Sequence, residues 1–417
     1  IKNLELLPQA TAGYDAEGGT GVLVINRQKK HEYGLSGYVG SEYERKSKNL
    51  FSEFAGLTYS WGNVALYANM ALGQSASLSK IFESDYGKNI TINSISESTD
   101  KSLYYMPKLG IDFYISPKHY LGVEWSGNYS KDYANACWVH STITDNSPYP
   151  TSIKSYAPYT LRPNTNDVTL NYEWKTDTLR SKLNIIADYA RKREHDLYEY
   201  ENKYTLGISS DSIISKSQPS FERIDVYSAQ VDFEKYFNHH QFTLGAKYVY
   251  AGIDYISKLY LGNTTLGGIL SEEIDQRDDF NYFEQRYAIY GMYRYTSRSW
   301  GVQMGLRNEY TEWNTQQRVK TQLHNSRSDN NIFPSFFVKK NMGQGNALSL
   351  SYTQSINRPS YQMVNPFVFH LSETSYKEGN PYLKGELLYN AALKFVLKSR
   401  YIFSLSALFI DRNINEV

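Results

Sequence analysis

Apolar and polar residues alternate with a period of two along most of this chain, as expected for β-strands with one apolar and one polar face. The segment 300–307 shows the pattern clearly, because its odd positions are glycine or polar and its even positions are Trp300, Val302, Met304 and Leu306. The same division recurs in 121–126, 242–248 and 389–395. Amphipathic helical patterns are scarce, so the sequence predicts an all-β, antiparallel protein.

Short polar turns separate these strands at similar distances. Their centres are 46 to 63 residues apart and lie at Gly62, Lys118, Thr176, His239, Arg298, Gln344 and Ser399. Each step holds two strands and one longer connection, which we expect near 88–100, 140–157, 205–219, 262–278, 319–330 and 359–385. All short turns should then lie at one end of the sheet. That arrangement is typical of transmembrane barrels. In soluble β-sandwiches, turn signals recur about every 8 to 12 residues along the sequence.

The aromatic content supports the same interpretation. The chain has 39 tyrosines, a mean hydropathy of -0.55 and no apolar run of the roughly 18 residues that a membrane helix needs. Tyrosine and tryptophan collect at bilayer interfaces. We expect a girdle beside the short turns, made by Trp61, Tyr120, Trp174, Tyr236, Trp300 and Tyr401. The alternative is a soluble β protein whose aromatic side chains bind carbohydrate.

About fifteen strands can be counted between Tyr33 and Asp411. Bacterial single-chain barrels have even strand numbers and must close, because open edges cannot face lipid. The pattern also begins within the first two dozen residues, so we expect that both ends of a longer chain are absent from this sequence. The lack of a visible signal peptide therefore says nothing about location.

Charge and candidate chemistry narrow the function classes. The formal net charge of +1 gives no argument for nucleic-acid binding, and the single Cys137 allows no internal disulfide. The pair His239 and His240 lacks a third metal ligand, and Gly18 to Gly21 lacks the lysine of a phosphate loop. The acidic run 271–279 lacks EF-hand spacing and is expected to be a solvated loop. We therefore predict no enzyme activity, no cofactor and no metal site.

Two motifs resemble those of TonB-dependent outer-membrane receptors, and more narrowly the Bacteroidetes outer-membrane β-barrel group. The first resembles the end of the family's plug domain, at Tyr14, Asp15, Ala16, Glu17, Gly18, Gly21 and Ile25. The second is an Asn-Arg-Pro segment beginning at Asn357, followed by Glu-Gly-Asn-Pro beginning at Glu378. Gly385 stands where the family usually has proline. Together the motifs bracket residues 7 to 386.

The resemblance implies a plug lodged inside a 22-stranded barrel in the bacterial outer membrane. Residues 1–29 would be the C-terminal end of the plug, and residues 30–417 a partial transmembrane barrel. It also implies uptake of a scarce ligand, energised through TonB and an inner-membrane complex that would engage a part of the plug outside this sequence. Outer-membrane lipid and a surface lipoprotein are further expected partners, and the ligand could be a chelate, glycan or peptide.

Candidate ligand contacts come from one long loop and from charges on the polar faces. The loop offers aromatic and amide side chains that could stack on a ligand, namely Tyr361, Asn365, Phe367, Phe369, Tyr376 and Tyr382. The same loop could instead fold on itself above the barrel, pinned by Pro366 and Pro381. The lumen-facing charges are expected to be Glu124, Asp188, Arg191, Lys247, Arg294, Arg307 and Glu309. Plug docking is favoured for them, with Arg294, Arg307 and Glu309 also kept as ligand contacts.

The sequence is also compatible with two other functions. The same barrel could be a non-transporting surface protein for adhesion or lipoprotein docking. The chain could also be a soluble carbohydrate-binding β protein, in which case the apolar faces would be buried against a second sheet.

Overall fold

The structure is a computed structural model of the chain. It describes residues 3–7, 12–13, 15–17, 22–26, 33–45, 49–87, 89–132, 135–145, 151–177, 180–206, 212–263, 271–318, 324–370 and 376–414. Within strands, the side chains of 3–7, 22–26, 206, 212, 263, 271–276, 368–370 and 376–377 lie outside the description.

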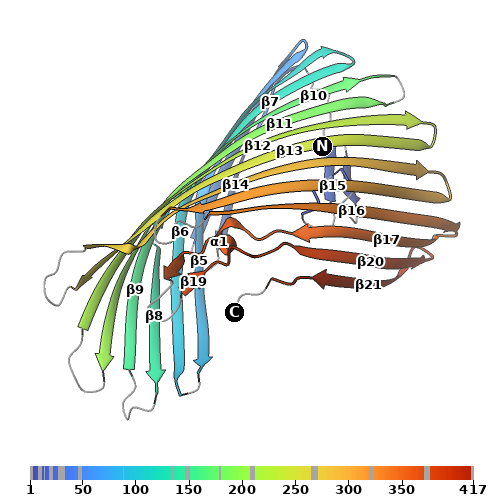
Figure 1. Ribbon diagram of the computed structural model, residues 1–417. Helices are drawn as coiled ribbons and strands as arrows, with labels where there is room; N and C mark the ends of the chain where they lie inside the picture. The colour runs from blue at the N-terminus through green and yellow to red at the C-terminus, as the bar shows by residue number, and fades with distance from the viewer. Residues whose placement is uncertain are drawn as a thin grey trace.

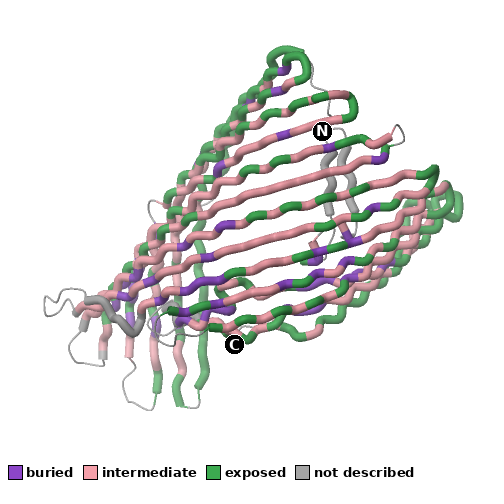
Figure 2. The backbone as a smooth tube through the Cα atoms, turned by 45° about the horizontal axis from the view of Figure 1, so that its top comes forward, coloured by how far each residue is buried: buried purple, intermediate pink, exposed green. Residues whose placement is uncertain are grey.

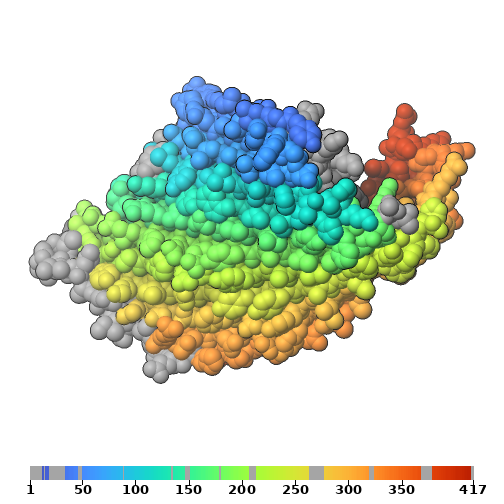
Figure 3. All heavy atoms as spheres, turned by 90° about the horizontal axis from the view of Figure 1, so that it is seen from above, coloured from blue at the N-terminus to red at the C-terminus, as the bar shows by residue number. Residues whose placement is uncertain are grey.

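One antiparallel sheet of seventeen strands dominates the described residues. It curves into a wall that runs from the N-terminal to the C-terminal strands (Figures 1 and 3). Its strands are β3 (Gly34–Arg45), β4 (Asn49–Trp61), β5 (Val64–Tyr86), β6 (Thr91–Ser116), β7 (His119–Asp132), β8 (Asn135–Thr144), β9 (Thr151–Leu161), β10 (Asn164–Lys175), β11 (Lys182–Leu206), β12 (Ser212–Phe237), β13 (His240–Asn263), β14 (Ser271–Thr296), β15 (Trp300–Gln317), β16 (His324–Gly343), β17 (Asn346–Asn357), β20 (Glu386–Leu397) and β21 (Tyr401–Asp411). The all-β antiparallel prediction is confirmed.

Smaller elements accompany the wall. Strands β1 (Asn3–Leu7) and β2 (Val22–Asn26) form a separate ladder, as do β18 (Val368–His370) and β19 (Tyr376–Glu378). The helix α1 (Tyr361–Val364) lies in the connection between β17 and β20. Among the described residues, no helix has the length and apolar character needed to cross a membrane.

The predicted short turns are confirmed at all seven positions. Backbone hydrogen bonds link neighbouring turns, such as Lys175 N to Lys118 O at 2.8 Å and Asn341 N to Ser299 O at 2.8 Å. The turns therefore lie side by side along one edge of the sheet (Figure 1). Several use the positive φ angles of tight hairpins, which Gly62 (56°) adopts without strain.

The strands β5, β6 and β11 to β14 are 23 to 26 residues long and extend beyond the length needed to cross a bilayer. As a result, the loops predicted at 88–100, 140–157, 205–219, 262–278 and 319–330 are wrong over most of their length. The apolar residues of these extensions fall on both faces, as Leu78 and Ile81 do in β5, so the extensions lack the regular alternation that identifies a strand. Cross-strand hydrogen bonds hold them instead, including Ser77 Oγ to Asp100 Oδ2 at 2.5 Å.

At two positions in the sheet, two shorter strands lie end to end where one long strand would otherwise run. Strands β7 and β8 pair with successive parts of β6, and β10 and β9 pair with successive parts of β11. The seventeen strands therefore occupy fifteen positions in the described sheet, which agrees with the expected count. The expectation of 22 strands in the full barrel remains a prediction.

The two faces of the sheet differ as the alternation predicts. One face exposes large apolar side chains, for example Leu244 (64%), Ile289 (65%) and Leu306 (56%). The alternate residues of the same strands point to the other face, where Arg307 is 1% exposed and Glu309 is 0% exposed. Buried positions recur between more exposed ones along the strands (Figure 2). The apolar face is thus exposed, which excludes the sandwich alternative.

The predicted girdle is partly correct. Trp61, Trp174, Trp300 and Tyr401 lie exposed on the apolar face next to the short turns. The assignment of Tyr120 and Tyr236 to the girdle is wrong. Each alternates with the outward-facing residues of its strand, so its side chain faces inward. There Tyr120 donates a hydrogen bond to Asp112 (2.6 Å) and Tyr236 donates one to Glu234 (3.0 Å). Position beside a turn does not decide which face a ring occupies, whereas strand parity does.

Candidate functional site

Residues 12–13 and 15–17 lie against the inner, polar face of the sheet. Ala16 accepts a hydrogen bond from Ile356 N at 3.0 Å, and Glu17 forms a parallel bridge with Ile356. The Ala16 side chain packs with Phe333, Ile356 and Leu387 in a small buried cluster. The chain comes so near to the wall that a Cβ added at Gly305 would lie 2.8 Å from the Ala12 Cβ. The segment is thus fixed by backbone contacts and close packing.

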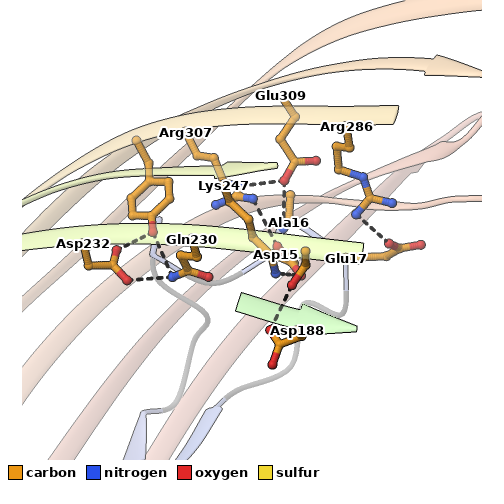
Figure 4. Close-up of polar contacts among 12 residues, drawn as sticks. Asp15, Ala16, Glu17, Asp188, Gln230, Asp232, Lys247, Arg286, Arg307 and Glu309 are labelled. Carbon is orange, nitrogen blue, oxygen red and sulfur yellow. Dashed lines mark hydrogen bonds and ion pairs between the residues drawn. The ribbon is translucent and has the colours of Figure 1, made fainter. Parts of the chain in front are cut away.

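Charged side chains surround this segment (Figure 4). Asp15 pairs with Lys247 at 2.7 Å and with Arg307 at 3.1 Å, which join β13 and β15 to one carboxylate. Glu17 lies 3.3 Å from Arg286 and 3.6 Å from Arg358. These contacts attach residues 15–17 to three strands of the sheet and to the residue that follows β17.

A buried carboxylate stands at the centre of these contacts. Glu309 is fully enclosed and pairs with Arg307 at 2.5 Å and with Arg358 at 2.6 Å, and the Ala16 N–H donates to it at 3.5 Å. We call the group the junction cluster. It comprises the cations Lys247, Arg286, Arg307 and Arg358 and the anions Asp15, Glu17, Glu284 and Glu309. Equal numbers of each charge compensate one another around the enclosed Arg307 and Glu309, while the side chains of Asp15 and Glu17 stay 36% and 41% exposed.

A layer of hydrogen bonds on the sheet supports the cluster. The Arg307 guanidinium lies over the Tyr290 ring, 5.1 Å from its centroid. The Tyr290 hydroxyl donates to Asp232 and accepts from Gln230 at 3.0 Å. These contacts restrict the orientation of Arg307, because its guanidinium is packed on one side and paired on the other.

The structure brings together some of the charges that the sequence singled out. Lys247, Arg307 and Glu309 meet in the junction cluster, whereas Arg294 bonds Gln303 at 3.1 Å nearer the short turns. Elsewhere on the inner face, Glu124 pairs with Lys108 at 2.8 Å. A hydrogen bond from Thr169 holds Asp188 at 2.8 Å.

The lumen assignment of Arg191 is wrong. Its side chain faces outward and pairs with Asp225 at 2.5 Å. Asp188 and Arg191 are three residues apart, so a regular strand cannot place both on one face. Sequence reasoning also missed Arg286, Glu284 and Arg358. Strand parity could have identified the first two, and Arg358 belongs to the Asn-Arg-Pro motif already noted.

The loop between β17 and β20 folds into the sheet. Helix α1 is capped by Ser360, whose side chain accepts from Met363 N. Val364 is 3% exposed and packs with Ile253, Phe280 and Tyr282 on the inner face. The loop therefore covers the inner surface of the strand extensions (Figure 1).

The predicted ligand-contact residues of this loop have different surroundings. The Tyr361 hydroxyl donates to Glu222, and Asn365 Nδ2 donates to Asp278 Oδ2 at 2.8 Å. Asn365 and Phe367 are both buried, while Tyr382 is 69% exposed. The side chains of Phe369 and Tyr376 lie outside the described residues. As candidates for ligand contact, all of them stay predictions.

Asp278 is unusual because it is a fully buried carboxyl group. Burial raises its pKa to about 6, although hydrogen bonds from Asn365 and Gln317 act in the opposite direction. It belongs to the acidic run that was expected to be solvated, so that expectation fails at this residue. The other side chains of the run from 271 to 276 lie outside the description. No three histidine, cysteine or carboxylate groups of the described chain gather closely enough to hold a metal ion.

The base of the loop is continuous with the junction cluster. Asn357 donates to Glu386 at 2.8 Å, and the next residue is Arg358 of the cluster. A cavity of about 20 Å³ lies between the two, lined by Thr311, Trp313, Arg358 and Val364 among others. That volume suits one water molecule. Among the described residues, Arg358 joins the base of the loop to residues 15–17.

Known proteins share this architecture. A family model described as the outer membrane protein beta-barrel family matches residues 174–417. No curated protein matches the sequence.

Three solved structures align over nearly the whole chain. The copper transporter OprC is 9% identical with a TM-score of 0.61, over 98% of this chain and 59% of its own. The siderophore receptor PiuA from Acinetobacter baumannii is 10% identical, with a TM-score of 0.57 and coverages of 98% and 68%. The ferric-catecholate import receptor Fiu from E. coli K12 is 10% identical, with a TM-score of 0.58 and coverages of 96% and 61%. At these identities the likeness shows the fold, and this chain spans about six-tenths of the length of OprC.

Proposed function

Because this chain belongs to the outer membrane protein beta-barrel family, and so to the bacterial outer membrane, we propose that it acts in a plugged receptor that takes up a scarce ligand. Residues 1–29 would be the end of the plug and residues 30–417 barrel wall. The junction cluster carries the proposal. It holds residues 15–17 inside the wall by ion pairs to Lys247, Arg286, Arg307 and Arg358, rather than by a wide apolar interface.

Such an attachment suits a plug that must move. Ion pairs can be exchanged for water when the plug shifts, since every charge in the cluster is one that water solvates well. An apolar interface would instead expose oily surface to a wet lumen. We infer that ligand capture at the outer mouth is followed by displacement of residues 12–17 from the wall, driven by TonB and its inner-membrane complex.

The loop with α1 is the proposed capture element. It covers the inner surface of the strand extensions and reaches the junction cluster through Arg358. Its exposed Tyr382 and the loop residues Tyr361, Phe369 and Tyr376 are the side chains that we propose meet the ligand. OprC and PiuA are named for copper and siderophores, so a metal or its chelate is the ligand class to examine first. A glycan or peptide delivered by a surface lipoprotein is the next class.

Cell accumulation tests the proposal. Cells expressing the full protein would receive radioactive copper, and separately radioactive iron bound to a catecholate siderophore, with and without a proton uncoupler. Energised uptake predicts accumulation that the uncoupler abolishes and that also fails in cells lacking TonB. Surface binding of the probe, unchanged by either treatment, would contradict uptake and favour a non-transporting surface barrel.

A further inference from the structure

A row of tyrosines crosses the outward face of the sheet on the side away from the short turns. Ring centroids are separated by 4.8 Å for Tyr189 and Tyr227, 6.0 Å for Tyr227 and Tyr250, and 5.1 Å for Tyr248 and Tyr287. Tyr310 continues the row on β15. Tyrosines in such rows lie where the apolar layer meets the head groups. Since the short turns face the periplasm, this row marks the outer leaflet.

Two arginines face each other directly beyond this row. Arg193 on β11 and Arg223 on β12 are register partners on the outward face. Arg193 follows Tyr189 by four residues, and Arg223 precedes Tyr227 by four residues. Four residues span roughly 13 Å of strand, and a strand tilt of about 40° turns this into roughly 10 Å along the membrane normal. The head-group layer is roughly 5–7 Å thick on each side, so the two arginines lie just beyond it, and an arginine side chain is long enough to reach back to the head groups.

This pairing is unfavourable in the protein alone. Like charges directly opposite each other on one face destabilise a sheet. Arg223 has a partner in Asp225 at 2.7 Å, but the same carboxylate also pairs with Arg191 at 2.5 Å. Within the described part of the chain, the Arg193 side chain makes no hydrogen bond or ion pair. An anion between the two arginines would replace repulsion by attraction.

The surface around the two arginines is hollowed. They line a groove of about 400 Å³ together with residues of β11 to β14 and Arg318, including His195, Phe221, Asp254 and Ile256. Asp254 accepts a hydrogen bond from Asn281, and Arg318 lies 3.8 Å from Asp279. The Arg193 guanidinium can therefore bind a ligand in this groove, which is lined by both charged and apolar side chains.

We propose that this groove binds the phosphate group of a lipid head group in the outer leaflet, with Arg193 and Arg223 as its ligands. Guanidinium groups bind phosphate through paired hydrogen bonds. A lipid is favoured over a soluble anion because the groove continues the lipid-facing side of the wall, where acyl chains would lie beside the tyrosine row. The proposal depends on membrane location and not on uptake, so the two can fail separately.

The test uses the full chain in phosphatidylcholine nanodiscs, with diphosphorylated lipid A as the probe and native mass spectrometry as the readout. The variant R193Q/R223Q removes both cations, and K118Q/R298Q removes two exposed cations at the short turns. We expect R193Q/R223Q to bind lipid A at least about tenfold more weakly than the unmodified protein. K118Q/R298Q should bind as the unmodified protein does, and R193K/R223K should be intermediate because lysine cannot form the paired bonds.

Folding is checked by heat-modifiable gel migration, and R193Q/R223Q should pass because it relieves a repulsion. Equal lipid A binding by R193Q/R223Q and the unmodified protein would overturn the site. Equal binding of dephosphorylated lipid A would overturn the role of phosphate. Full displacement of lipid A by inorganic phosphate would overturn the assignment to a lipid. Uptake of copper or siderophore-bound iron by R193Q/R223Q should be unchanged.

Discussion

Arg358, at the base of the loop that carries α1, donates from Nη2 to Oε2 of Glu309 over 2.6 Å. Its other terminal nitrogen lies 3.6 Å from Glu17. One side chain therefore contacts the loop, the wall and the segment inside the wall. Under the proposed function, Arg358 would link the capture loop directly to the plug segment.

Removing this side chain should loosen both the loop and the inner segment. We expect R358A to raise hydrogen exchange about tenfold at Ile356 N–H, which bonds Ala16 O, and in α1, because the buried cation ties them together. R327A is the matched control, since Arg327 bonds Leu383 O and Asp329 in the same loop region without touching residues 15–17. Faster exchange at Ile356 in R327A as well would contradict a specific link through Arg358.

Glu309 should be the most sensitive member of the junction cluster. E309Q leaves Arg307 and Arg358 without their enclosed counter-charge, and breaking such a pair costs about 3–5 kcal/mol. Urea unfolding in detergent measures this loss. E53Q, at an exposed position of β4, should change the free energy of unfolding by less than about 0.5 kcal/mol. A small effect of E309Q would show that water reaches the cluster freely.

The close approach at Gly305 offers a way to displace the inner segment. In G305V the added Cβ lies 2.8 Å from the Ala12 Cβ and 2.7 Å from the Ser335 Oγ; the Ser335 hydroxyl can rotate away, so residues 12–13 and 15–17 should move from the wall. Cells carrying G305V should become sensitive to large antibiotics that the outer membrane normally excludes. G301V is the control on the same face, because its nearest neighbour, Lys339 Cβ, is 3.9 Å away. Equal sensitivity in both variants would argue for general damage to the wall.

Asp278 should give the loop a pH dependence. Burial raises its folded pKa to about 6, above the ordinary value of 3.8. The protonated form is therefore favoured by folding, and its contribution to stability is complete below about pH 4 and lost as the pH rises through about 6. D278N should stabilise the protein at pH 7 by up to about 3 kcal/mol. Its unfolding should vary less between pH 4 and 7 than that of the unmodified protein, and equal slopes would contradict the assignment.

The free-energy cost of a charged side chain on the apolar face should increase with its depth in the bilayer. I289R, near the middle of the band, should cost about 2–4 kcal/mol when the protein folds into lipid. L78R introduces the same side chain at a position that is similarly exposed, 63% against 65%, but lies on the strand extension. We expect L78R to cost at most about 1 kcal/mol. Similar costs for the two variants would mean that the band does not face lipid.

Much of the wall could be predicted because it follows two local rules. Turn residues fix the hairpins at Gly62 and Gln344, and period-two alternation assigns faces, so Leu244 and Glu309 lie where the pattern places them. The errors arise where these rules were not applied or do not act. Arg191, Tyr120 and Tyr236 were assigned by residue type or by nearness to a turn, although parity placed them on the other face.

The strand extensions and the candidate site depend on long-range contacts. Ser77 and Asp100 bond across two strands whose polar faces look like loop in sequence. The meeting of Asp15 with Arg307 joins residues 292 positions apart, which no local pattern encodes. The Asn-Arg-Pro motif marked the correct region, but the burial of the loop residue Asn365 against Asp278 requires the positions of β14 and α1 together.

The hydrogen-bonded short turns have a mechanical consequence. Backbone hydrogen bonds join neighbouring hairpins: Tyr114 N–H donates to Asn63 O, and Ser399 N–H donates to Gly345 O. Turns linked in this way resist the separation of neighbouring strands, so this edge of the described wall should keep its curvature. Under the proposed function, a ligand would then pass by movement of the residues inside the wall and not by widening of this edge.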